Sequence, residues 1–207
     1  MLTLALCLIG LGVAALLWLD RPVLDLVLAE PDWLFDAARK VTDAGKSDPY
    51  LLAGAVLFLV WRFILPHPVL AQRALFVFVA VAASGLATDL LKIVFGRARP
   101  KLLLADGEEG FAFFRFGHDR ASFPSGHATT AAALALALAL VAPRWRWPAF
   151  LFGAGIAATR VVIHAHYLSD ALFGAAVGTL TVWLLLKSRL NPDAPPVPRL
   201  SMAAGKG

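Results

Sequence analysis

The long apolar blocks of this chain constrain its fold more than any other feature of the sequence. Six of them occupy, approximately, residues 1–19, 50–65, 69–95, 123–142, 147–163 and 168–187. A helix of about 20 apolar residues is long enough to cross the hydrocarbon core of a bilayer. With 59% hydrophobic and only 16% charged residues, the 207-residue chain is also far more apolar than an ordinary soluble domain. The sequence therefore predicts an all-α fold, an integral membrane bundle of six transmembrane helices.

The remaining segments predict smaller features. The first block has no Lys or Arg before it and no clear cleavage site, so we expect a spanning helix there and not a signal peptide. Apolar residues recur at helical spacing over residues 32–41, which is typical of a short interfacial helix. Gly174 and Gly178 form a GxxxG pattern that favours close helix packing. The proline-rich residues 191–207 are expected to lack regular structure, which leaves one membrane domain over residues 1–190.

The charged residues favour a membrane topology over nucleic-acid binding. The net charge is +5 and the pI about 9.8, but the basic residues stand mostly at the ends of apolar blocks and form no run. The single cysteine, Cys7, excludes an intrachain disulfide and a cysteine metal cluster. No nucleic-acid partner is therefore expected.

Six crossings would place both termini on one side of the membrane, together with the turns near residues 66–68 and 143–146. That side carries eight of the 19 Lys and Arg residues but only Asp193 of the 14 acids. Short, acid-poor turns favour the cytoplasm. We therefore expect a bacterial inner-membrane protein whose opposite face, toward the periplasm or exterior, carries three polar motifs.

The first motif closes the third block with Lys92, Arg99 and Pro100 in the pattern K-x6-R-P. Two cations at a helix end can clamp an anion, because lysine acts as a point charge and the planar guanidinium of arginine matches phosphate oxygens. Snorkelling to lipid headgroups, or a pair between Lys92 and Asp89 one turn earlier, would explain the same residues without catalysis.

The second motif, Pro124-Ser125-Gly126-His127, opens the fourth block. Pro, Ser and Gly are typical of a helix start, where free N–H groups and the helix dipole attract anions. Ser125 and Gly126 are therefore candidate phosphate-binding residues, and His127 could donate a proton. A capped helix with a polar histidine at the membrane interface is the simpler alternative.

The third motif runs from Thr159 and Arg160 to His166 and Asp170. His166 and Asp170 share one helix face, so the carboxylate could hold one ring nitrogen while the other attacks phosphorus. A buried His–Asp pair that satisfies only its own hydrogen bonds would give the same pattern. The remaining histidines, which are expected to be bystanders, are His67, His118 and His164. Together the motifs supply three cations, a helix start and two histidines, which suits phosphoryl transfer.

The order of these motifs resembles the signature of the type 2 phosphatidic acid phosphatase superfamily. The motifs span residues 92–170, and the six-block pattern extends the similarity over nearly the whole chain. Thr159 departs from the serine usual before the arginine, but it keeps a hydroxyl. The resemblance implies that His166 attacks phosphorus, Asp170 fixes its tautomer and His127 protonates the leaving oxygen. It also implies a phosphate-binding set, which is Lys92, Arg99, Ser125, Gly126 and Arg160.

The same resemblance implies a membrane lipid phosphatase that forms a phosphohistidine intermediate. Its substrate would be a lipid phosphate such as phosphatidic acid, phosphatidylglycerol phosphate, undecaprenyl pyrophosphate or a lipid A phosphate. No cofactor and no metal are expected, because the sequence lacks a Walker A loop, an HExxH pair and the carboxylate cluster of a two-metal site. A lipid-to-lipid phosphotransferase and a non-catalytic binder of anionic headgroups are the alternatives. Membrane lipids are the other expected partners, and the oligomeric state stays open.

An aromatic loop lies between the first two motifs, where Phe111, Phe113, Phe114 and Phe116 surround Arg115. The rings either pack on the helix ends as a cap or lie in the membrane interface as a wall along which lipid chains enter.

Overall fold

The computed structural model describes residues 1–115 and 117–193. Its α-helices are α1 (Leu2–Ala14), α2 (Asp20–Leu28), α3 (Asp32–Thr42), α4 (Asp48–Leu59), α5 (Pro68–Phe95), α6 (Pro100–Asp106), α7 (Gly126–Val141), α8 (Arg146–Val162) and α9 (Leu168–Leu186). The π-helical stretches are Ala15–Leu19 and Val60–Ile64, and the 3-10 turns are Asp43–Gly45, His118–Arg120 and Pro143–Trp145. The tail predicted to lack regular structure lies, from residue 194 on, outside the described residues.

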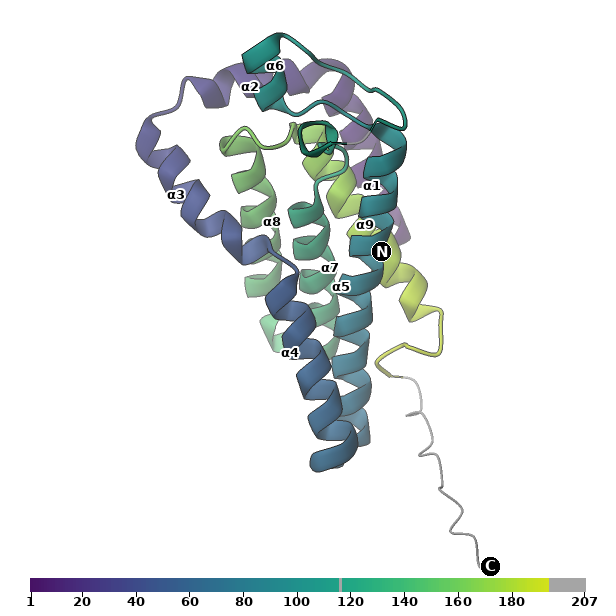
Figure 1. Ribbon diagram of the computed structural model, residues 1–207. Coiled ribbons are helices and arrows are strands. Elements are labelled where there is room, and N and C mark those ends of the chain that lie inside the picture. The colour runs from purple at the N-terminus through teal and green to yellow at the C-terminus, as the bar shows by residue number, and fades with distance from the viewer. Residues whose placement is uncertain (116, 194–207) are drawn as a thin grey trace, which may run out of the picture.

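Each of the six apolar blocks forms a helix, which confirms the all-α fold (Figure 1). Four helical stretches of the described chain are long and apolar enough to cross a membrane, and these are Leu2–Leu28, Asp32–Ile64, Pro68–Phe95 and Leu168–Leu186. The apolar helix α7 has 16 residues and α8 has 17, which is about the lower limit for a crossing. The six predicted transmembrane helices are therefore present as helices, and four of them belong to stretches with the full length of a span.

The sequence predicted that the first helix ends near residue 19, but in the structure it is longer. It continues through the π-helical stretch Ala15–Leu19 into α2, so that residues 2–28 form one continuous helical stretch. Pro22 explains the irregularity, because it has no N–H and its ring collides with the carbonyl of the preceding turn, a conflict that a π-bulge relieves. Asp20, at the start of α2, is buried with only 5% of its surface exposed.

The short helix predicted over residues 32–41 is confirmed as α3, which packs against α8. Ala38 of α3 lies in one cluster with Ile163 and Ala165, which follow α8. This packing carries the end of α3 and the turn at Gly45 to the start of α7, where a Cβ on Gly45 would lie 2.9 Å from the ring of His127.

The first motif lies at the end of α5, a helix of 28 residues. The helix begins behind His67, whose Nδ1 accepts a hydrogen bond from the amide of Leu70 at 3.3 Å. It ends at Gly96, whose φ of 54° is in the left-handed region that glycine adopts without strain. A Cβ on Gly96 would also collide with the carbonyl oxygen of Ala112. A glycine is therefore required where the chain turns from α5 into the segment that carries the next two arginines.

The predicted close packing at Gly174 and Gly178 is confirmed. A Cβ on Gly174 would lie 2.5 Å from the carbonyl oxygen of Ser125, and one on Gly178 would lie 2.6 Å from that of Thr129. Both glycines thus let α9 approach the backbone of α7, as small residues do in membrane helix pairs. This contact fixes the start of α7 against the first turns of α9.

We expect Gly174→Val to destabilise the protein strongly, because the new side chain would meet backbone that cannot move without separating α7 from α9. Overpacking of this kind costs about 1–3 kcal/mol or more. Gly155→Val on α8 is the matched control, since a Cβ there meets no atom within 4 Å. Thermal unfolding midpoints in detergent would measure the difference, and equal midpoints for the two variants would contradict the packing argument.

The helix ends that carry the three motifs meet at one end of the bundle. Figure 1 shows α2 and α6 at that end, with the last turns of α9 pointing away from it. The end of α5, the start of α7, the end of α8 and the start of α9 are thereby brought together, although the motifs are far apart in the sequence.

Candidate active site

The start of α7 is built as the second motif predicted. Ser125 is the N-cap residue, and its Oγ accepts a long hydrogen bond of 3.5 Å from the amide of Ala128. Its own amide donates to the carbonyl of Asp170 at 2.9 Å. Ser125 is completely buried. The helix start, with the free amides that anions favour, is therefore anchored to the first turn of α9.

Lys92 reaches this helix start from α5. Its Nζ lies 3.2 Å from the position that a Cβ on Gly126 would take. The same Nζ also lies 3.4 Å from Oδ1 of Asp89, so the pair that the sequence offered as an alternative is present as well. Since the Asp89 side chain is 70% exposed, this pair contributes little to stability and leaves the ammonium free to meet an anion beside Gly126.

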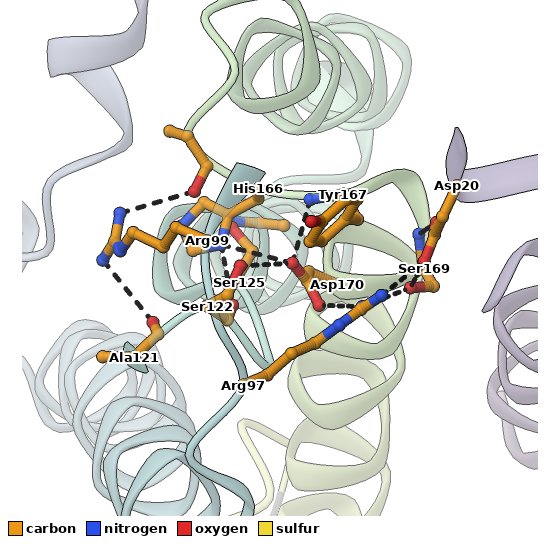
Figure 2. A network of polar contacts seen from close by, with 12 residues as sticks. Asp20, Arg97, Arg99, Ala121, Ser122, Ser125, His166, Tyr167, Ser169 and Asp170 are labelled. Carbon is orange, nitrogen blue, oxygen red and sulfur yellow. Dashed lines mark hydrogen bonds and ion pairs between the residues drawn. The ribbon is translucent and has the colours of Figure 1, made fainter. Parts of the chain in front are cut away.

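Arg99 is held at the site by backbone carbonyls. Its Nε donates to the carbonyl of His118 at 2.9 Å, and one Nη atom donates to that of Ala165 at 3.4 Å. The other Nη atom donates to the carbonyl of Ala121 at 3.5 Å (Figure 2). Burial lowers the pKa of Arg99, against the opposing charges of Asp170 and Asp119. A buried guanidinium that is bound only by backbone carbonyls and has no carboxylate in direct contact is a favourable partner for a phosphate.

Arg160 comes from the end of α8 and is 9% exposed. Its Nη1 donates to Oγ1 of Thr42 at 2.9 Å. Its Nε has no hydrogen-bond partner among the residues that the structure describes. A buried guanidinium with an unused donor costs free energy until something accepts from it, and a phosphate oxygen would do so.

His127 stands one residue inside α7 and is half-buried. It lies near Lys92 and Arg160, whose positive charges act on it. It also lines a cavity of about 220 Å³ between the start of α4, α5 and α7. This position gives it access both to the cationic cluster and to a space large enough for part of a ligand.

His166 has the geometry of a nucleophile. Its Nδ1 lies 2.7 Å from the carbonyl oxygen of Ser122, and since a carbonyl can only accept, Nδ1 carries the proton and Nε2 keeps its lone pair. Burial lowers the pKa of His166 to about 4, against the opposing effect of Asp170. The ring is therefore neutral at physiological pH.

The structure corrects the predicted contact between His166 and Asp170. Oδ2 of Asp170 lies 3.8 Å from Nδ1 of His166, beyond hydrogen-bond distance. Oδ2 instead accepts from Oγ of Ser122 at 2.6 Å and from the amide of Tyr167 at 2.9 Å. Asp170 thus acts on His166 as a nearby charge and through Ser122, whose carbonyl holds the ring directly (Figure 2).

A buried ion pair between Arg97 and Asp20, which the motifs did not predict, lies next to Asp170. Nη1 of Arg97 lies 2.5 Å from Oδ1 of Asp170, and Nη2 lies 2.7 Å from Oδ2 of Asp20. Ser169 also donates two hydrogen bonds to Asp20, one from its amide at 2.9 Å and one from its hydroxyl at 2.6 Å. The Arg97 guanidinium also lies 4.3 Å from the ring centroid of Tyr167. Figure 2 shows this chain of contacts running from α2 to α9.

The sequence contained a signal for this pair. Arg97 stands inside the first motif and Asp20 ends the first apolar block, and a charge at such a place needs a partner. Burial alone would lower the pKa of Arg97, but the two carboxylates raise it above its ordinary value. Arg97 therefore stays charged and helps to fix the position of Asp170.

The aromatic loop is divided between the two predicted arrangements. Phe111 and Phe113 pack with Phe95 at centroid distances of 5.9 Å each, and Phe111 lies 5.6 Å from Phe123, which supports the cap. Phe114 is 66% exposed, as a residue in the membrane interface would be. Phe116 lies outside the described residues.

Every predicted site residue lies in one region, and the described chain contains no group of three or more His, Cys, Asp or Glu residues that could hold a metal. The cations come from α5, the segment after it and α8, and they surround a helix start and two histidines. Such an arrangement can neutralise a phosphate, attack it from one side and protonate a leaving oxygen.

Comparison with known proteins agrees with this geometry. The chain matches the model of the PAP2 superfamily over residues 73–192. It is 43% identical over 104 residues to a lipid A 1-phosphatase of Rhizobium johnstonii and 41% identical over 103 residues to a lipid A 1-phosphatase of Rhizobium etli. These stretches cover 50% of this chain and 42% and 44% of the relatives, so the chain spans less than half the length of the curated relatives it matches.

The fold is similar to the crystal structure of a transmembrane PAP2-type phosphatidylglycerolphosphate phosphatase from Bacillus subtilis, with a TM-score of 0.64 and 21% sequence identity. The likeness covers 90% of this chain and 94% of that one. An integral membrane protein is thus supported both by the apolar helices and by the fold. Because the family match covers more than half of the chain and contains all three motifs, the chain belongs to the PAP2 superfamily.

Proposed function

We propose that this protein is a membrane lipid phosphatase that works through a phosphohistidine. The observation that carries the proposal is the convergence of Lys92, Arg99 and Arg160 on the start of α7, with His166 and His127 beside them. A non-catalytic binder of anionic headgroups would need the cations but not a buried neutral histidine held in one tautomer.

In the proposed reaction, Nε2 of His166 attacks phosphorus while the bond to the leaving oxygen breaks. The three cations and the first amides of α7 neutralise the phosphoryl oxygens, and His127 donates its proton to the leaving oxygen. Water then attacks the phosphohistidine, His127 takes a proton from that water, and the P–N bond breaks to release inorganic phosphate and restore His166.

The membrane arrangement is part of the same proposal. All six apolar helices cross the bilayer, the termini lie in the cytoplasm, and the site faces the periplasm or exterior. The short, acid-poor turns on the side of the termini support this orientation. A reporter fused to the C-terminus tests it, and reporter activity typical of an external C-terminus would reverse it.

A lipid A phosphate is the first substrate to test, because the two curated relatives are lipid A 1-phosphatases. Phosphatidylglycerol phosphate, phosphatidic acid and undecaprenyl pyrophosphate complete the panel. Purified protein in detergent should release inorganic phosphate from at least one of these lipids. Release from none of them, with phosphate passed to an added acceptor lipid instead, would favour a phosphotransferase. Binding without either reaction would favour a headgroup binder.

We expect the activity to survive strong chelation, because arginine and lysine side chains provide the positive charge at the site. Vanadate should inhibit, since its five-coordinate form resembles the transition state and such analogues bind tightly. Phosphate release measured with EDTA, and then with vanadate, checks both expectations. Loss of turnover in EDTA that a divalent ion restores would contradict the proposed chemistry.

A further inference from the structure

The direction in which the leaving group departs is determined by the two histidines. In phosphoryl transfer the attacking and leaving atoms lie on opposite sides of phosphorus, roughly in line. His166 attacks in the proposed reaction, and His127 protonates the leaving oxygen. The group attached to that oxygen must therefore lie on the His127 side of the phosphate.

The cavity of about 220 Å³ lies on that side. Within the described chain its lining includes Lys92, Gly126 and His127, but not His166. The cavity therefore borders the proposed phosphate site at Lys92, Gly126 and His127, which is the side of the proton donor.

The rest of the lining is unusually polar for a space at the end of apolar helices. It consists of residues from the turn before α4 and its first residue, from α5 and from α7, which are Lys46, Ser47, Asp48, Thr88, Asp89 and Thr130, together with Gly45 and Gly85. Carboxylates accept hydrogen bonds, the ammonium donates, and the hydroxyls do both. Lys46 pairs with Asp43, Asp89 with Lys92, and Thr88 with Ser84 and Thr129. A hydrocarbon leaving group would still displace water from exposed polar groups such as Asp48 without replacing its hydrogen bonds, at a cost, whereas a group that carries hydroxyls would replace them.

We infer that this cavity binds a hydroxyl-bearing leaving group, the sugar or polyol through whose oxygen the phosphate is attached to the lipid. The inference rests on the proposed phosphatase function and adds the chemical class of the group next to the phosphate. The volume supports a single ring or a short polyol, because pockets that hold whole drug-sized ligands begin at about 300 Å³. The acyl chains lie outside the cavity.

The substrate panel tests the chemical class directly. An acylated sugar 1-phosphate and phosphatidylglycerol phosphate both have leaving groups that carry hydroxyls. In the first the hydroxyls belong to a sugar, and in the second to a glycerol. The diacylglycerol that leaves phosphatidic acid has its neighbouring hydroxyls esterified. A site that hydrogen-bonds a substrate hydroxyl discriminates strongly against an analogue without it, so we expect kcat/KM for one of the first two to exceed that for phosphatidic acid at least about tenfold.

Gly85→Leu is the sharpest variant. Gly85 lines the cavity, and a Cβ there meets no atom within 4 Å, so the added side chain takes up space without a clash at its first atom. We expect the ratio of kcat/KM for the preferred substrate to that for phosphatidic acid to fall about tenfold. Gly155→Leu on α8 is the matched control, since its Cβ also meets no atom within 4 Å and it does not line the cavity.

We expect the same ratio of kcat/KM values to fall in Asp48→Asn, which leaves the volume of the cavity unchanged. The substitution removes one charged acceptor that a hydroxyl would use. Asp25→Asn, an exposed acid on α2, is its control. A ratio that stays constant in both Gly85→Leu and Asp48→Asn would overturn the inference, as would a preference of the wild type for phosphatidic acid. If the wild type hydrolyses no lipid phosphate at all, the proposed function fails, which is a separate result.

Discussion

His166→Ala is expected to abolish phosphate release, with a loss of at least roughly 10⁴-fold in kcat, because removing a nucleophile leaves only binding and charge neutralisation. The variant should still fold, since the substitution removes a single hydrogen bond, the one to the carbonyl of Ser122. Inorganic phosphate release from the preferred lipid measures the effect. A short incubation with a labelled substrate, followed by alkaline quenching, should trap labelled phosphohistidine in the wild type and none in the variant.

His118→Ala is the matched control, because His118 is an exposed histidine at the same end of the bundle and contributes only its backbone carbonyl to Arg99. Its activity should stay within about twofold of the wild type, as surface substitutions usually do. Near-normal turnover of His166→Ala would refute the mechanism, and so would an equal loss in His118→Ala.

Arg97→Met should cause the largest loss of stability, about 3–5 kcal/mol, because it breaks a buried ion pair and leaves uncompensated charge behind. The side chains of Arg97 and Asp20 are each 6% exposed, and that of Asp170 is completely buried. Methionine fills much of the same volume but cannot donate to either carboxylate. Thermal or denaturant unfolding in detergent measures the change, and kcat should also fall because Asp170 loses its support.

Arg21→Met is the control for this experiment. Arg21 pairs with Glu109 at 3.3 Å, but the two side chains are 57% and 59% exposed, and such surface pairs contribute about 0–1 kcal/mol. A double-mutant cycle separates the buried pair from general damage. Asp20→Asn should cost much less in the Arg97→Met background than in the wild type. Equal costs in both backgrounds would show that Asp20 and Arg97 do not act together.

The helices and the chemical inventory of the site could be predicted from the order of residues. A chain segment that crosses a bilayer must satisfy its backbone hydrogen bonds internally, so a long apolar block already indicates a helix. The start of α7 was equally predictable, because capping depends on neighbouring residues such as Ser125 and Gly126. The cations and histidines were found in the same way, since a polar residue at the end of an apolar block needs a reason.

The end of the first helix, by contrast, was predicted incorrectly. The apolar block ends at residue 19 and Pro22 follows soon after it, and a proline inside a helix usually ends or kinks it. The π-helical stretch before it keeps the helix continuous to Leu28. An apolar pattern that ends at residue 19 does not reveal that a π-bulge before Pro22 lets the helix continue.

The group that holds His166 could be identified only from the folded arrangement. Sequence spacing favoured Asp170, which shares its helix face, yet the carbonyl of Ser122 is closer by more than an ångström, at 2.7 Å against 3.8 Å. Ser122 reaches that place because its amide pairs with the carbonyl of Arg97 at 3.1 Å, in a loop 44 residues before the histidine in the chain. Hydrogen bonds discriminate on differences of a few tenths of an ångström, and such differences are set by the packing of distant segments.

The same holds for the support of Asp170. Asp20 and Arg97 are 77 residues apart, and the residue pattern of neither segment indicates that the two side chains pair. They meet because the N-terminal helix continues past its π-helical stretch and the chain turns sharply at Gly96. The sequence thus specified which groups were available for chemistry. Which of them touch, and where the cavity beside His127 lies, follows from helix packing alone, because contacts between distant segments leave no local periodicity in the chain.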